Sequence, residues 1–344
     1  MGVMKITDVH AVQPPTPGSP PDWRTHLGQI LVEVQTDTGL SGIGVGGGGA
    51  ASIHVVRTVL RDLLIGREAG EVEILHHDMH RHTSFYGRKG LVIMAISGVD
   101  LALWDLRGKT AGKSVAELLN PKVDLDRAIP TYATVFDEDD AKAALNAGHA
   151  AIKLHVERFG DRPDESQIAG LVARVRDVIG ADGQLMIDAF ARWDIDTTLR
   201  IDEAIAGFDV AWLEEPLAPD DHAGYKTLSE QSKIPIAGGE HEYTSAGFKE
   251  LIDHRLHQVL QPDVNWCGGL TTLIDVYRMA QAAGLRVCPH RGCEPFALPA
   301  IAALDLQPLA ESPRTWFNCL QNAPKIHEGV IRLSGAPGFG VAVR

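Results

Sequence analysis

The sequence predicts a TIM-type (β/α) barrel with an N-terminal α+β capping domain. Two observations carry this prediction. Beyond about residue 129, short apolar strands alternate with amphipathic helices, whereas the residues before about 125 read as strands followed by helices. About eight βα units in roughly 200 residues are typical of such a barrel. We therefore expect a capping domain over residues 1–125, a barrel over 126–320 and a C-terminal segment, 321–344, that returns to the capping domain.

The capping domain is expected to begin with antiparallel strands. "KITDVHAVQ" alternates between apolar and polar residues, and "QILVEVQTDTGLSGIGVG" reads as a hairpin with its turn near Thr38-Gly39. The later segments "SIHVVRTVLRDLLIG" and "LVIMAISGVDLALWDLRGK" are predicted to be helical. In the second of them, apolar residues from Ile96 to Leu106 recur at helical spacing.

The barrel is expected from the alternation of strands and helices that follows. Helical patterns such as "ESQIAGLVARVRDVIG" and "LTTLIDVYRMAQAAG" close on a glycine before the next strand. The tail "HEGVIRLSGAPGFGVAV" reads as a hairpin that packs on the first domain. The predicted strands are "IPTYATV", "AIKLHV", "QLMIDAF", "VAWLEEP", "IPIAGGE", "QVLQPDV", "RVCPHRG" and a segment between Gln307 and Leu320.

Composition limits the classes of partner and the compartment. The 344 residues are 44% hydrophobic and 22% charged, and 32 basic against 45 acidic residues give a net charge of −13, which argues against nucleic acid or an anionic membrane as the main partner. The N-terminus lacks the pattern of a signal peptide, and the apolar runs are too short to span a bilayer. The cysteines form no CxxC pair, so we expect a cytoplasmic protein with reduced thiols.

Polar side chains follow one predicted barrel strand after another, at the point where each strand ends. "VAWLEEPL" shows the pattern: an apolar strand runs into the carboxylates Glu214 and Glu215, and Pro216 then ends it. Because the carboxyl ends of parallel strands meet at one mouth of a barrel, where barrel enzymes keep their chemistry, we expect these side chains to converge. They lie about one βα unit apart and comprise Lys153 with His155, Asp188, Glu214, Glu240, Asp263 and His290.

Three of these residues, Asp188, Glu214 and Glu240, are carboxylates on successive strands and predict a Mg²⁺ site. Mg²⁺ takes hard oxygen ligands and often shares its coordination shell with a substrate. Zinc is less favoured, because neither cysteine nor histidine is among the three. A single acid at a strand end is often only solvated, but three on consecutive strands favour a metal.

The next two strands end in Asp263 and His290, which together predict a general base. An aspartate beside a histidine orients the ring and supports its positive form. Lys153 and His155 lie two residues apart on one strand, so both point into the barrel, and we expect them to approach the metal from the side opposite His290. A divalent ion between such groups can stabilise the enediolate that forms when the proton α to a carboxylate is removed.

Taken together, these motifs resemble the mandelate racemase group of the enolase superfamily, and within it the acid-sugar (aldonate/aldarate) dehydratases. "AISGVDLALWDLRGKTAGKSVAELL" is similar to the segment that joins the capping domain to the barrel in that family. "KLH", "IDAF", "WLEEP", "GGEHEYT", "QPDVNWCGG" and "PHRGCEP" match its barrel motifs in order and spacing. The resemblance covers nearly the whole chain and implies the modified enolase-superfamily barrel.

Carried over position by position, the resemblance implies a role for each matching residue. Asp263 and His290 would form the catalytic dyad. Lys153 would neutralise the substrate carboxylate, and Glu311, near the eighth strand, would hydrogen-bond it. The family also implies a homo-oligomer built from dimers. The Mg²⁺ ligands would be Asp188, Glu214 and Glu240.

The sequence departs from the family pattern in two places. Many relatives have Lys-x-Lys on the second strand, where this chain has Lys153-Leu154-His155, and many have Asp-x-Asn where it has Asp188-Ala189-Phe190. A racemase needs a base on each face of the α-carbon, so the loss of the second lysine favours one-sided chemistry. In a dehydratase, His290 could both take the α-proton and help the β-hydroxyl leave, or His155 could take one of these roles.

The function expected from this resemblance is a Mg²⁺-dependent dehydratase that converts an aldonic or aldaric acid to a 2-keto-3-deoxy acid. The alternative within enzymes is a racemase or epimerase of a 2-hydroxy acid that uses the same enediolate chemistry. The alternative from another class is a barrel that binds metal and ligand without turnover.

The resemblance implies that substrate specificity lies in the cap loops, Pro14 to Leu27 and Gly44 to Ser52. Trp23, Arg24 and His26 are the candidate substrate-binding residues there. Arg24 could meet a distal hydroxyl or a second carboxylate of the sugar acid, although an exposed loop arginine is an equal alternative.

Three further motifs are compatible with other sites. "GIGVGGGGA" contains G-x-G-x-x-G but lacks the following strand with an acidic end that a dinucleotide site requires, so a cap loop is favoured. "HHDMHRH" places His76 and His80 four residues apart on a helix, which suits a metal, but no acid or cysteine cluster completes the set, so a solvated helix face is expected. "HEYTS" lacks the second histidine of a zinc protease motif.

Overall fold

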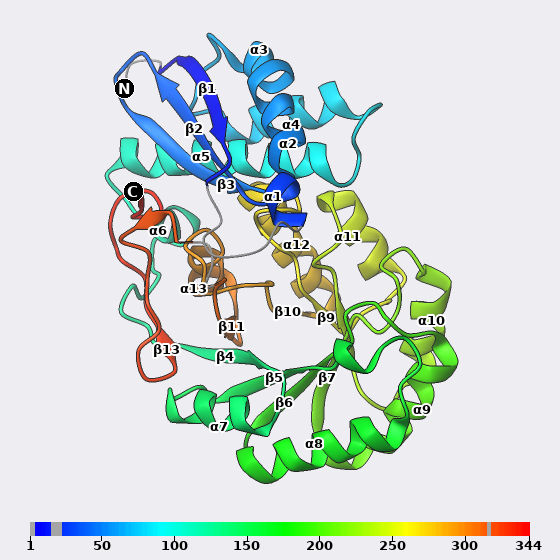
Figure 1. Cartoon of the computed structure of the whole chain (residues 1–344). Helices are drawn as coiled ribbons and strands as arrows, with labels where there is room; N and C mark the ends of the chain where they lie inside the picture. The colour runs from blue at the N-terminus through cyan, green and yellow to red at the C-terminus, as the bar shows by residue number, and fades with distance from the viewer. Residues whose placement is uncertain (1–3, 15–22, 315–317) are drawn as a thin grey trace.

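The computed structural model describes residues 4–14, 23–314 and 318–344, and the backbone alone of Trp23. A small antiparallel sheet with its helices is stacked on a curled parallel sheet that is surrounded by helices (Figure 1). The predicted fold class, a barrel with an α+β cap, is therefore confirmed. Within the described residues, no helix is long and apolar enough to cross a bilayer.

The cap is built on three antiparallel strands in the order β1-β2-β3, namely Ile6–Val12, Ile30–Thr36 and Ser41–Gly46. The π-helical turn Val56–Leu60 joins the second and third of its helices. These helices are α1 (Trp23–Leu27), α2 (Gly49–Val55), α3 (Arg61–Leu64), α4 (Val72–Thr83), α5 (Leu91–Ala111) and α6 (Val115–Leu119).

The glycines of β3 allow α5 to lie directly on the sheet. Gly42, Gly44 and Gly46 alternate along the strand and face α5, and a Cβ at any of them would overlap a backbone carbonyl oxygen of that helix. A Cβ on Gly98 of the helix would in turn meet the Val32 side chain at 2.6 Å. Close helix–sheet packing accounts for the alternating glycines, which the sequence alone left compatible with a dinucleotide fingerprint.

The barrel is a curled sheet of parallel strands in the order β10-β9-β8-β7-β6-β5-β4-β11. Its strands are β4 (Ile129–Val135), β5 (Ala151–His155), β6 (Gln184–Asp188), β7 (Val210–Glu214), β8 (Ile236–Gly238), β9 (Val259–Leu260), β10 (Arg286–Val287) and β11 (Ala310–Glu311). The helices around it are α7 (Glu138–Asn146), α8 (Glu165–Ile179), α9 (Ile195–Ile205), α10 (His222–Gln231), α11 (Thr244–Asp253), α12 (Gly269–Ala283) and α13 (Leu298–Leu304). Among the described residues no ladder joins β10 to β11, and the Cys288 thiol instead donates to the Leu309 carbonyl at 3.5 Å.

A layer of apolar side chains, one from each barrel strand or its flank, fills the interior of the barrel. The rings of Tyr132 and Trp212 meet edge to face with centroids 6.2 Å apart, and small residues lie beside them. Because side chains alternate along a strand, the next inward positions of β5, β6 and β7 lie one layer closer to the carboxyl ends. The members of the layer are Tyr132, Ala151, Met186, Trp212, Ala237, Val259, Cys288 and Leu309.

The C-terminal residues contact both the barrel and the cap. The strand β13 (Val330–Ile331) pairs antiparallel with β4, and β14 (Ala342–Val343) pairs with β12 (Leu320–Gln321). The backbone N–H of Phe339 donates to Asp105 on α5 at 2.9 Å. The division of the chain at residues 125 and 320 stays a prediction.

The turn that leads into β13 offers a test of this docking. Gly329 has φ 72°, and its carbonyl accepts hydrogen bonds from the backbone and hydroxyl of Thr131 on β4. A Cβ at Gly329 would overlap the Gly148 carbonyl, whereas Gly66, with φ 77°, has open space around the same position. Both alanine variants carry the left-handed strain of about 1–2 kcal/mol. Gly329→Ala should lose roughly 1–3 kcal/mol more through the overlap.

The measurement is the midpoint of thermal unfolding of both variants beside the wild type. We expect a clearly lower midpoint for Gly329→Ala than for Gly66→Ala. Equal midpoints would show that the turn at Gly329 is not tightly held against the barrel.

Candidate active site

The sequence-predicted strand-end residues lie above the apolar layer, at the carboxyl ends of the barrel strands. His155, Asp188 and Glu214 are register partners on β5, β6 and β7. The structure therefore brings these polar residues to one end of the sheet. The residues that follow β8, β9 and β10 by two or three positions are Glu240, Asp263 and His290.

Lys153 on β5 is a fully buried ammonium held by three carboxylates. Its Nζ lies 2.7, 2.8 and 3.2 Å from oxygens of Glu214, Glu311 and Asp188, respectively. Burial alone would lower the pKa of Lys153, but these carboxylates raise it well above the usual range. Lys153 is therefore held in its charged form by these carboxylates.

Glu214 on β7 is held from three sides. Besides Lys153, it accepts from the indole N–H of Trp212 at 3.2 Å and from the amide of Gln261 at 2.5 Å. Burial nevertheless raises the pKa of Glu214 to about 7, against the lowering effect of Lys153. Trp212 thus serves two layers, because its ring fills the apolar interior and its N–H orients the carboxylate above.

His290 and Asp263 form a hydrogen-bonded pair in the buried part of the site. The Nδ1–H of His290 donates to Asp263 at 2.9 Å, and its Nε2 lies 3.1 Å from Glu240 and 3.9 Å from Glu311. Burial opposes the charged imidazole, but these neighbouring carboxylates raise the pKa of His290. Asp263 is held in turn by the backbone N–H of Asn265 at 2.8 Å. This arrangement leaves Nε2 as the atom that faces the acidic cluster.

His155, at the end of β5, has a different environment from His290. Its ring lies between Phe136 and Phe190, with centroids 5.5 and 5.3 Å away. Its Nε2 is 3.7 Å from Asp188, and its Nδ1 has no hydrogen-bond partner among the described residues. Burial lowers the pKa of His155, which favours a neutral ring.

Sequence reasoning missed the pair Glu215 and His241, which lies beside Glu240. His241 Nδ1–H donates to Glu215 at 2.8 Å, and His241 Nε2 is 3.6 Å from Glu240. Burial opposes positive charge on this histidine. The hydrogen bond to Glu215, with the nearby charge of Glu240, outweighs burial and raises the pKa of His241 to about 9. The indole of Trp266 lies between His241 and His290, with its ring centroid 5.9 and 5.7 Å from theirs. The sequence could have indicated His241, because this residue directly follows the predicted metal ligand Glu240.

The cap reaches this site through its glycine-rich loop. A Cβ on Gly47 would lie 2.8 Å from Trp266 Nε1, so the loop backbone lies directly against that indole. Arg24 and His26 are on α1, and a Cβ on Gly49, at the start of α2, would overlap the His26 carbonyl. The side chain of Trp23 lies outside the described residues. Substrate roles for these α1 residues stay predictions.

The donor set fits a hard divalent cation. Asp188, Glu214 and Glu240 offer carboxylate oxygens, the ligands that Mg²⁺ prefers. Burial raises the pKa of all three, although cationic neighbours oppose the rise, so additional positive charge among them would be stabilising. Among the described residues, the group whose donor atoms already lie within 4.8 Å of one another is Glu215, Glu240 and His241. Glu240 belongs to both sets.

Comparison with known protein families identifies both parts of the chain. Residues 13–120 match the family described as mandelate racemase / muconate lactonizing enzyme, N-terminal domain. Residues 137–344 match the family described as enolase C-terminal domain-like. The second match alone covers more than half of the chain.

Individual relatives agree with these families. An L-rhamnonate dehydratase of Saccharopolyspora erythraea is 36% identical over an alignment of 327 residues. The alignment covers 92% of this chain and 83% of that protein. The crystal structure of L-rhamnonate dehydratase from Gibberella zeae has a TM-score of 0.88 at 26% identity, and covers 100% of this chain and 95% of that one. The crystal structure of L-talarate dehydratase from Polaromonas sp. JS666, complexed with Mg and L-glucarate, has a TM-score of 0.86 at 28% identity. It covers 99% of this chain and 95% of that one. The chain therefore belongs to the mandelate racemase group of the enolase superfamily.

Proposed function

We propose that this protein is a Mg²⁺-dependent dehydratase of an aldonic acid, which it converts to the 2-keto-3-deoxy acid. The observation that carries the proposal is the pair His290 and Asp263, 2.9 Å apart, with His290 Nε2 turned toward the buried carboxylates. The dehydratases among its relatives support the reaction class, and the structures named with Mg support the cofactor.

Asp188, Glu214 and Glu240 are the residues proposed to hold Mg²⁺. When bound there, the ion supplies positive charge to the substrate carboxylate, which makes the α C–H bond more acidic. Lys153, already a buried cation among these carboxylates, is placed to bind the same substrate carboxylate. Glu311 is held by Lys153 and by the backbone N–H of Arg291 at 2.7 Å, and orients that end of the substrate.

His290 is proposed to act twice. As the neutral base it takes the proton from C2, and Asp263 stabilises the imidazolium that results. The electron pair of that C–H bond forms the enediolate of the carboxylate, whose collapse breaks the C3–O bond. The same imidazolium then gives its proton to the leaving hydroxyl, so that one water is released. The enol that remains tautomerises to the 2-keto-3-deoxy acid.

The two faces of the α-carbon are not equally equipped. Lys153 is fixed as an ammonium and is no base. His155 is a neutral ring between Phe136 and Phe190, with only a 3.7 Å approach to Asp188 to orient it. This asymmetry favours elimination over racemisation, which would need a second oriented base.

The rim beside His155 favours an uncharged distal end of the substrate. Phe136 and Phe190 are each 45% exposed at the carboxyl ends of β4 and β6, where they present apolar surface. A second carboxylate would be poorly solvated against these rings, whereas a methyl or hydroxymethyl end would not. We therefore expect a monoacid such as L-rhamnonate to be a better substrate than a diacid such as L-talarate.

The direct experiment incubates the protein and Mg²⁺ with L-rhamnonate and with L-talarate and measures 2-keto acid with semicarbazide. We expect keto acid from the monoacid and little from the diacid. Exchange of the α-proton without keto acid would favour the racemase alternative. A better rate on the diacid would contradict the role given to the rim.

Glu240→Gln tests the metal site. A neutral amide supplies one carbonyl oxygen where a charged ligand is needed, so Mg²⁺ affinity and turnover should both fall to near background, while the thermal midpoint stays close to that of the wild type. Isothermal titration with Mg²⁺ and the keto acid assay measure the two losses. Full turnover in this variant, or in excess EDTA, would remove the metal mechanism.

His290→Asn tests the dyad. Loss of the base should lower kcat by roughly 100- to 10,000-fold with little change in KM, because general base catalysis supplies about that factor. His155→Ala is the matched variant for the opposite face. In deuterated solvent, exchange at the α-carbon should vanish in His290→Asn and persist in His155→Ala. Exchange that survives the loss of His290 would show that His155 is a second base.

A further inference from the structure

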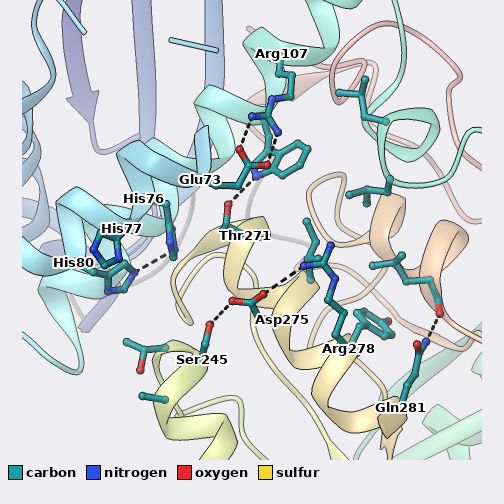
Figure 2. Close-up of a pocket in the computed structure, with 18 residues that line it drawn as sticks. Glu73, His76, His77, His80, Arg107, Ser245, Thr271, Asp275, Arg278 and Gln281 are labelled. Atoms are coloured by element: carbon teal, nitrogen blue, oxygen red, sulfur yellow. Dashed lines mark hydrogen bonds and ion pairs between the residues drawn. The ribbon is translucent and has the colours of Figure 1, made fainter. Parts of the chain in front are cut away.

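A pair of histidines on α4, outside the candidate active site, lies where the cap meets the barrel. Figure 2 shows His76, His77 and His80 on this helix, with His76 and His80 in contact. Their Nε2 atoms are 3.1 Å apart. The sequence suggested a solvated helix face, which is wrong for His76, because its side chain is buried against Gly268 and Thr272 of the barrel.

Three polar atoms from α4 and the barrel gather around His76 Nε2. His80 Nε2 lies 3.1 Å away, the Gly268 carbonyl 2.9 Å and the Thr272 hydroxyl 3.3 Å. At Nε2 a neutral imidazole offers either one N–H or one lone pair, so His76 cannot make a full hydrogen bond to all three atoms at once. In the tautomer that carries its proton on Nδ1, His80 presents the lone pair of Nε2 toward His76.

We propose that His76 and His80 form a second metal site, specific for a borderline transition ion such as Zn²⁺ and distinct from the proposed Mg²⁺ site. Two bonds of about 2.0–2.1 Å from one ion to imidazole nitrogens span about 3–3.4 Å at ordinary bond angles, which matches the observed separation. Imidazole nitrogens suit Zn²⁺, Cu²⁺ or Ni²⁺, whereas Mg²⁺ prefers oxygen. The Gly268 carbonyl and the Thr272 hydroxyl are the further donors on the protein side.

An ion has a route to this position. His76, His77 and His80 line a cavity of about 700 Å³ between the cap helices and α11 and α12, with Glu73 and Asp275 on its walls (Figure 2). His80 also lines a neighbouring cavity of about 800 Å³. The ion would take the place of the proton between the two Nε2 atoms.

Occupancy would connect the cap to the loop that carries Asp263. Gly268 follows Asp263 and Trp266 on this loop, and its backbone N–H donates to Ser97 of α5 at 2.9 Å. The Cys267 N–H donates to the Asp263 carbonyl at 2.8 Å. An ion held by α4 and the Gly268 carbonyl would therefore clamp α4 to the loop and raise the stability of the junction.

The test titrates Zn²⁺ into protein saturated with Mg²⁺, by calorimetry and by the thermal midpoint, in wild type, His80→Gln and His77→Gln. Glutamine at position 80 still accepts a hydrogen bond from His76 but supplies no imidazole lone pair. His77 is the matched control, because it is the adjacent, exposed histidine in the same cavity. We expect Zn²⁺ to raise the midpoint of the wild type and of His77→Gln. In His80→Gln the affinity should fall at least about 10- to 100-fold, the cost that even an outer-shell change carries.

Anomalous diffraction at the zinc edge locates the ion without any variant. A peak between His76 and His80 supports the proposal. Equal Zn²⁺ affinity in wild type and His80→Gln, or a peak only among the carboxylates near Glu240, would overturn it. Unaltered Zn²⁺ binding in the Mg²⁺-site variant Glu240→Gln separates this outcome from a failure of the proposed function.

Discussion

The ammonium of Lys153 is the interaction on which the rest of the site depends. A buried carboxylate is costly unless it is paired, and here Asp188, Glu214 and Glu311 share one buried cation. Without Lys153 or another cation beside them, these acids would have to bind protons or move toward solvent. The three carboxylates in turn hold the lysine in its charged form.

This charge cluster is positioned by the apolar layer beneath it. Trp212 and Tyr132 fill the barrel interior, and the period of two along each strand places polar residues directly above them. Trp212 therefore positions Glu214: its ring packs in the apolar layer below, and its N–H donates to the Glu214 carboxylate above. A change of register by one residue on β7 would turn Glu214 away from the interior, so packing and chemistry depend on the same strand alignment.

The sequence was sufficient for the barrel and its strand ends, because alternation and the convergence of parallel strands are local rules. It was insufficient where the backbone turns or distant segments meet. Glu215 has φ 38°, and the turn that this creates brings its side chain to His241, which strand periodicity does not foresee. His76 is buried by Gly268, 192 residues away along the chain. No helical pattern within "HHDMHRH" contains that contact.

The loop from Asp263 to Gly268 is one of the places where the cap contacts the barrel beside the site. Gly47 of the cap lies against Trp266, and His76 of α4 binds the Gly268 carbonyl. The same loop begins at Asp263, which hydrogen-bonds His290. A cap that shifts with its ligand would therefore move the indole beside His290 and strain the support of the dyad. Any displacement of the cap at these contacts would thus reach the proposed dyad through one short segment of backbone.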